Sequence, residues 1–252
     1  MIDVSFRVIP VIDIQNGVVV HAQGGDRRGY KPFASSCVSE NPDAVAVATS
    51  LRDRFGFREV YLADLDAIGS GRPSSAVLPR LLELEIKVIA DLGIKDQVDF
   101  CSLPSSYCGT SLILATETLG GAACLDRLVQ THPAERFIFG LDFRNGTPLV
   151  AAGSDWGSGS PAALVQRASA AGLNHVLLLD LAKVGTGAGN GLFPLVERLL
   201  LQNNSLEIFV GGGIAGIDEI VRWKAAGVSG VLVGSALHGG QIVPSDLARL
   251  RS

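Results

Sequence analysis

A repeat within the sequence restricts the possible folds more than any other feature. The segment D-x-x-N-G occurs at residues 13–17 and again at residues 142–146. D-L followed by G-S-G or G-T-G occurs at residues 64–71 and 180–187, and residues 91–94 and 115–121 have counterparts at residues 211–214 and 234–240. The four pairs keep the same order and lie about 120 residues apart. The repeat therefore predicts that the chain consists of two similar halves.

Eight short apolar runs predict the strands of a parallel sheet, because most are continuous rather than alternating, as in strands buried on both faces. Helix-like segments such as residues 43–55, 160–171 and 217–226 lie between them. A four-strand half leaves an open edge that a second half can close. We therefore predict an α/β fold, a single (β/α)8 TIM barrel over residues 1–252, with half-barrels of about residues 1–128 and 129–252. The alternative is an open doubly wound sheet, which would not require matched loops in both halves. The predicted strands are residues 8–14, 59–64, 86–91, 111–115, 137–142, 175–180, 207–211 and 230–234.

Composition excludes several classes of function. With 47% hydrophobic and 18% charged residues the chain can bury a large core, and its net charge of −4 argues against nucleic acid or an anionic membrane as a partner. No signal peptide or membrane anchor is visible, and the four cysteines lack C-x-x-C spacing. We expect a cytoplasmic protein with reduced thiols, no metal and no organic cofactor.

Asp13 and Asp142 are the predicted catalytic pair. They end the first and fifth strands, and strand ends of this kind face the active-site mouth of a barrel. Two opposed carboxyl groups can divide acid and base work if their surroundings separate their pKa values. The alternative is that each aspartate only organises the Asn-Gly turn that follows it.

A phosphate site is predicted where glycine-rich strand ends leave backbone N–H groups free. Gly212 and Gly213 end the seventh strand, and Gly234 and Ser235 end the eighth. The alternative is a tight turn that needs glycine for geometry alone. The matching first-half site would use the residues Gly93, Thr116 and Thr118, but Asp91, Leu92 and the nearby Glu117 would weaken or abolish phosphate binding there.

Five further residues are candidates for substrate binding. Asp64 and Asp180 could bind sugar hydroxyls or could cap the following loops, and Thr186 follows the sixth strand. Trp156 could cover a flat ring or anchor its own loop. His21 could point towards the mouth, although a lone histidine is more often structural.

Several of these segments together resemble the HisA/HisF histidine-biosynthesis barrel family. They are I-P-V-I-D at residues 9–13, A-D-L-D at 63–66, G-L-D-F-R-N-G at 140–146, G-G-G-I at 211–214 and V-G-S-A-L at 233–237. The resemblance implies a duplicated half-barrel that binds a bis-phosphorylated substrate, with a phosphate site in each half and a carboxylate pair at Asp13 and Asp142.

The isomerase branch of that family is the more similar one, because of A-D-L-D-A, residues 23–26 and Trp156. The cyclase branch, which works with a glutaminase, usually has lysine at the position of His21, so the resemblance implies no obligatory protein partner. D-L-G at residues 91–93, residues 115–118 and Lys183-Val184 depart from the usual pattern. These departures are similar to those of diverged HisA-like paralogues associated with pterin-dependent one-carbon metabolism.

Three functions follow as hypotheses. The first is a HisA-like isomerase that carries out an aldose–ketose rearrangement of Amadori type on a phosphorylated ribosylamine. The second is a paralogue acting on another substrate, with a single phosphate. The third is a barrel that binds a phosphorylated metabolite without catalysis.

Overall fold

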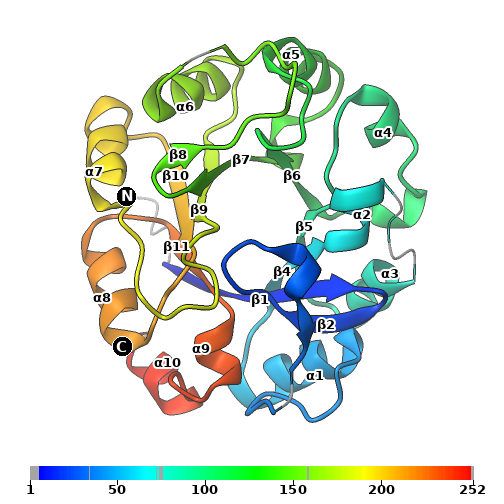
Figure 1. The fold of residues 1–252 in the computed structure, drawn as a ribbon, viewed down its shortest axis with the longest axis vertical. Helices are drawn as coiled ribbons and strands as arrows, with labels where there is room; N and C mark the ends of the chain where they lie inside the picture. Colours follow the sequence, from blue (N-terminus) through cyan, green and yellow to red (C-terminus); the bar gives the residue numbers. More distant parts are fainter. Residues whose placement is uncertain (1–5, 34, 72, 74–75, 158, 251–252) are drawn as a thin grey trace.

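Eight parallel strands form a closed barrel, and helices surround it (Figure 1). The computed structural model describes residues 6–33, 35–71, 73, 76–157 and 159–250. Within these residues each barrel strand pairs with the next in chain order, and the last pairs with the first to close the sheet. The barrel strands are β1 (Arg7–Gln15), β4 (Glu59–Asp64), β5 (Lys87–Asp91), β6 (Ser111–Ala115), β7 (Phe137–Arg144), β9 (His175–Asp180), β10 (Glu207–Gly211) and β11 (Gly230–Val233).

The outer layer consists of helices that follow the strands. The ends of the helix Ala44–Phe55 carry clear signals: the Asp43 carboxylate accepts the N–H groups of Val45 and Ala46, and Gly56 ends the helix with φ +73°. None of the helices in the described ranges is long and apolar enough to cross a membrane. The helices are α1 (Ala44–Phe55), α2 (Leu65–Ser70), α3 (Val77–Leu82), α4 (Gln97–Cys101), α5 (Ala122–Thr131), α6 (Pro161–Ala170), α7 (Phe193–Gln202), α8 (Ile217–Ala225), α9 (Ser235–His238) and α10 (Pro244–Leu250), with 3-10 turns η1 (Arg27–Gly29), η2 (Ser105–Tyr107) and η3 (Ala134–Arg136).

Both copies of D-x-x-N-G form the same hairpin. Asn16 and Gly17 connect β1 to β2 (Val18–His21), and Asn145 and Gly146 connect β7 to β8 (Thr147–Pro148). All four turn residues have positive φ, between 51° and 77°, which is the Asn-Gly geometry of a two-residue hairpin turn. In the first half, β2 pairs further with β3 (Lys31–Pro32). The repeat therefore has a structural counterpart at the start of each half.

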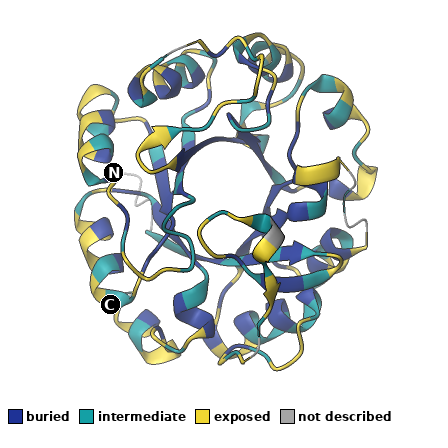
Figure 2. Cartoon of the chain, viewed as in Figure 1, coloured by how far each residue is buried: buried dark blue, intermediate teal, exposed yellow. Residues whose placement is uncertain are grey.

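The core has two parts, visible as buried segments in Figure 2. One lies between the barrel and the helices, and the other fills the barrel interior with alternate residues of the strands. Interior side chains come from all eight barrel strands, which makes the centre a packed core rather than a channel. The fully enclosed members include Ile9, Tyr61, Ile89, Ile113, Ile138, Leu177, Phe209 and Leu232.

The predicted fold class is confirmed. The observed strands match the eight predicted ones within two residues at each end, and the order of strand and helix is that of a (β/α)8 barrel. The half-barrel boundary near residue 128 stays a prediction; that position falls inside α5, and the two sets of four strands divide after this helix.

Candidate active site

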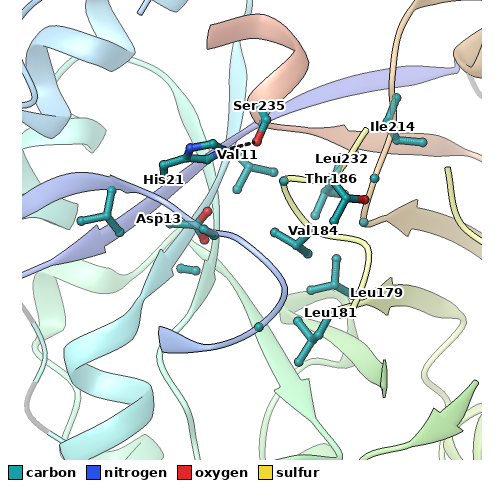
Figure 3. Close-up of a pocket in the computed structure, with 18 of the residues that line it drawn as sticks. Val11, Asp13, His21, Leu179, Leu181, Val184, Thr186, Ile214, Leu232 and Ser235 are labelled. Carbon is teal, nitrogen blue, oxygen red and sulfur yellow. Dashed lines mark hydrogen bonds between the residues drawn. The ribbon is translucent and has the colours of Figure 1, made fainter. Parts of the chain in front are cut away.

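A cavity of roughly 470 Å³ opens at the carboxyl ends of the strands. It brings together eight of the predicted site residues from both halves of the chain. Figure 3 shows Asp13 with His21 and Ser235 across from Thr186 and Ile214. The predicted residues in its lining are Asp13, His21, Asp142, Thr186, Gly212, Gly213, Gly234 and Ser235.

Strand alternation explains why particular aspartates face this cavity. Successive side chains of a strand point to opposite faces, so a residue two positions beyond an interior side chain also points inward. Asp91 lies two positions after the interior residue Ile89, and Asp142 lies four positions after the interior residue Ile138. Asp13 and Asp91 lie on either side of Ala63 in the strand register. Three carboxyl groups therefore share the inner face at the top of the barrel.

One arginine lies among these carboxyl groups. Arg27, from η1 in the loop after β2, donates from Nη2 to Glu117 at 2.8 Å, and its charge acts on Asp13, Asp91 and Asp142. The sequence prediction did not include Arg27 among the site residues. Nothing local in the sequence marks it, because its partner is 90 residues away along the chain.

Two contacts fix the Asp91 side chain. Its Oδ1 accepts the Gly93 N–H at 3.0 Å, and its Oδ2 lies 3.4 Å from the Tyr61 hydroxyl, which donates to it. The sequence prediction treated Asp91 only as a disturbance of a phosphate loop. The structure adds it, with Tyr61, to the cavity lining.

Burial raises the pKa values of all three aspartates. The pKa of Asp13 rises to about 7, chiefly by desolvation, while Arg27 acts to lower it. Burial likewise raises the pKa of Asp91 to about 6. Desolvation and then the charge of Asp91 hold the pKa of Asp142 well above its usual range. At neutral pH the cavity therefore contains protonated and ionised carboxyl groups together, as acid–base chemistry requires.

The rim of the cavity opposite the aspartates is formed by the glycine-rich backbone of residues 212–213 and 234–235. Gly212 and Gly213 leave β10 with φ of +92° and +80°, a conformation that favours glycine, and Gly234 and Ser235 lead into α9. His21 Nε2 lies 3.0 Å from Ser235 Oγ (Figure 3). This rim offers a hydroxyl, an imidazole and backbone groups to a ligand.

An aromatic stack supports His21. The Phe33 ring packs between the rings of His21 and His238, with centroids 4.7 and 3.9 Å away. His238 Nδ1 lies 2.7 Å from Ser36 Oγ, and burial lowers the pKa of His238 to about 4, so His238 is neutral at pH 7. The stack fixes the orientation of the His21 ring towards Ser235.

Five predicted site residues are not brought into this cavity lining. Asp64 and Asp180 end their strands on the outward-facing side of the alternation, because Ala63 and Leu179 occupy the inward positions. Asp64 accepts the Ala67 N–H at 3.0 Å and Asp180 accepts the Ala182 N–H at 3.2 Å. Their observed contacts are those of loop caps.

The other three lie in the scaffold. The Thr116 hydroxyl is buried and donates to the Leu149 carbonyl at 2.6 Å. Trp156 is 6% exposed and donates from Nε1 to the Leu119 carbonyl at 3.1 Å, which is the contact of a loop anchor. Gly93 packs against the backbone of Ile68.

A profile of the family described as "Histidine biosynthesis protein" matches residues 7–243, nearly the whole barrel. The chain belongs to this family. Proteins similar to it include an uncharacterised protein of Methanocaldococcus jannaschii, 29% identical over 93% of this chain and 94% of the relative. An imidazole-4-carboxamide isomerase of Chloroflexus aggregans is 31% identical over 96% of this chain and 97% of its own, and one of Synechococcus sp. RCC307 is 29% identical over 95% and 91%. The names of these two isomerases specify a substrate with two phosphoribosyl groups.

Within the described ranges, no group of three or more histidine, cysteine or acidic side chains has a geometry that could hold a metal ion.

The raised pKa values make the stability of this family member depend on pH. The carboxyl of Asp91 has an ordinary pKa of 3.8 and a pKa of about 6 in the folded chain, and that of Asp13 rises to about 7. The folded state binds these protons more tightly than the unfolded state does. The contribution of the two carboxyl groups to stability is therefore complete below pH 4 and is lost as the pH rises through 6 to 7. We expect the free energy of unfolding to fall over this range.

Asp91→Asn keeps the shape and the acceptor for the Gly93 N–H but cannot ionise. We expect it to flatten this pH dependence and to stabilise the protein by about 2 kcal/mol at pH 8, allowing for some relaxation around the carboxylate. Urea unfolding at pH 5, 6.5 and 8 measures both quantities. An unchanged slope would show that Asp91 is already ionised at low pH in the folded chain.

Proposed function

We propose that this chain is an aldose–ketose isomerase that carries out an Amadori-type rearrangement of a phosphorylated ribosylamine. One observation carries the proposal: Asp13 and Asp142, from equivalent positions in the two halves, line one cavity whose opposite rim is the Gly212–Gly213 and Gly234–Ser235 backbone. Its relatives from Chloroflexus aggregans and Synechococcus, which are named as isomerases, support the same reaction class.

The two carboxyl groups differ in the way that this reaction needs. Asp142 is 5% exposed, and burial holds its pKa well above its usual range, which favours its protonated form. Asp13 has a pKa of about 7, and Arg27 favours its ionised form. We therefore assign Asp142 as the general acid and Asp13 as the general base.

The reaction divides into two proton transfers. Asp142 donates its proton to the ring oxygen of the sugar as the bond between C1 and that oxygen breaks, which leaves an iminium at C1. Asp13 then removes the proton from C2, and the electrons of the C–H bond form the C1–C2 double bond of an enaminol. Transfer of the C2 hydroxyl proton to solvent and addition of a proton at C1 give the aminoketose. No external oxidant or reductant is needed.

The phosphate is assigned to the rim formed by Gly212, Gly213, Gly234 and Ser235. Free backbone N–H groups at such strand ends and the Ser235 hydroxyl are suited to an anion, and His21 beside Ser235 can add a further donor. Holding the substrate by a group that does not react places C1 and C2 near the carboxyl pair, which lowers the entropic part of the barrier.

A direct assay tests the proposal with an N-aryl 5-phosphoribosylamine, which forms from ribose 5-phosphate and an arylamine. We expect the protein to convert it to the aminoketose, detected as a new ketone carbon by ¹³C NMR, faster than the uncatalysed rearrangement in the same buffer. Binding of the compound with no conversion would instead favour a barrel that binds phosphorylated metabolites without catalysis.

A further inference from the structure

The two halves of the barrel contribute different strand-end residues to the cavity. In the second half, Gly212, Gly213, Gly234 and Ser235 all line the cavity. Their first-half counterparts, Gly93 and Thr116, are outside the lining, although the repeat places them at equivalent strand ends. The two sets of residues are equivalent in sequence, but only the second-half set is accessible from the cavity.

Contacts within the protein occupy the first-half loop at Gly93 and the Thr116 side chain. The Asp91 carboxylate accepts the Gly93 N–H at 3.0 Å, so the backbone donor that an anion would use is already occupied by an anion of the protein. A Cβ added at Gly93 would lie 2.5 Å from Ile68 Cα, which shows how closely the backbone of α2 covers this loop. The Thr116 hydroxyl is committed to the Leu149 carbonyl at 2.6 Å. A phosphate would find these two donors already in use.

Charge excludes a phosphate from the same end. Asp13 and Asp91 lie within the influence of the Arg27 guanidinium, and Arg27 is already paired with Glu117 at 2.8 Å. A phosphate brings close to two further negative charges, and like charges a few ångströms apart in a partly desolvated site repel strongly.

The Asp142 carboxyl group remains available to a ligand at this end. It is 5% exposed, lines the cavity, and makes no side-chain hydrogen bond with any described residue. A carboxyl oxygen can accept a hydrogen bond in either protonation state, so a ligand with an N–H or O–H group would give Asp142 a partner.

We propose that the substrate carries one phosphate, held at the Gly212–Ser235 rim, and directs a phosphate-free end with N–H or O–H donors towards Asp91, Asp142 and Arg27. This inference rests on the proposed function, because it uses the same cavity and the same phosphate rim. It separates this chain from the relatives whose names specify two phosphoribosyl groups.

Tungstate, an X-ray-visible analogue of phosphate, tests the number of anion sites. In crystals soaked with tungstate we expect one anomalous peak in the cavity, at Gly212 and Ser235, and none at Gly93 and Thr116. A second peak at Gly93 would overturn the single-phosphate proposal and leave the proposed function standing. No peak at Ser235 would remove the phosphate rim and with it both proposals.

A matched pair of sugars tests the same point in solution. Fructose 6-phosphate and fructose 1,6-bisphosphate differ only by the second phosphate, and we expect the bisphosphate to bind no more tightly than the monophosphate by calorimetry. In Asp91→Asn, which removes one charge and keeps the side-chain shape, the affinity for the bisphosphate should rise about tenfold relative to the monophosphate. A bisphosphate that binds the unaltered protein tenfold more tightly, or an affinity ratio unmoved by Asp91→Asn, would overturn the proposal.

Growth gives a third test. We expect the chain not to restore growth of a histidine-requiring strain that lacks the isomerase, because that substrate needs two phosphate sites. Growth at the rate supported by the Chloroflexus aggregans isomerase would contradict a single-phosphate substrate.

Discussion

Replacing Asp142 with asparagine should lower kcat/KM by about 10³-fold, within the range that general acid–base groups contribute. The asparagine keeps the shape of the side chain but cannot donate a carboxyl proton to the ring oxygen. Asp13→Asn should have a loss of similar size, because the amide cannot accept the proton from C2. The NMR assay with the N-aryl phosphoribosylamine measures both.

Stability separates a catalytic loss from unfolding. Burial raises the pKa of Asp13 and that of Asp142, so ionising either carboxyl costs stability, and both amide variants should be at least as stable as the unaltered protein at pH 8. Asp126→Asn serves as a control, since Asp126 pairs with Arg167 on the helical exterior. It should keep activity within about threefold, the variation common for surface changes. Full activity in either amide variant of the pair would refute the acid–base assignment.

Gly212→Ala should destabilise the barrel by about 3 kcal/mol or more and remove phosphate binding. Gly212 has φ +92°, and a Cβ there would lie 2.3 Å from the Asp180 carbonyl oxygen and 2.9 Å from its carbon. These are backbone atoms of a barrel strand, so they cannot move aside as a flexible side chain would. The displaced loop would carry the phosphate rim away from Ser235.

A second glycine provides the matched control. Gly172 has φ +96°, nearly the same conformation, but an added Cβ would meet nothing within 4 Å. Gly172→Ala should therefore cost only about 1 kcal/mol, the usual conformational penalty, and should leave phosphate affinity unchanged. Urea unfolding and calorimetry with fructose 6-phosphate measure the two effects. Equal losses in the two variants would show that conformation, and not close packing, decides the role of Gly212.

Most of the fold could be predicted because its signals are local. Continuous apolar runs mark buried parallel strands, and the Asn-Gly pairs at residues 16–17 and 145–146, each placed directly after a strand, mark hairpins. The site was only partly predictable. Alternation along a strand separates Asp91 and Asp142, which face inward, from Asp64 and Asp180, which cap loops. Applied to the strand ends, that rule would have found Asp91.

Other site features depend on contacts between distant segments. Arg27 reaches the site by a loop whose path follows from the β2–β3 pairing, and its bond to Glu117 joins the ends of two separate strands. The closure of the Gly93 loop by Asp91 and Ile68 depends on how α2 packs over it. These contacts join residues that lie far apart along the chain. A pattern of neighbouring residues therefore does not predict them, and they become visible only in the folded structure.

The pairing of β11 with β1 also determines when the molecule can become complete. Residues 7–10 of β1 hydrogen-bond in register with residues 230–233. During synthesis, the outer edge of β1 must wait until residues 230–233 have left the ribosome before it finds its neighbour. Pairing of the first and eighth barrel strands is thus the last step in closing the barrel, and a nascent chain arrested before β11 would expose that strand edge to aggregation.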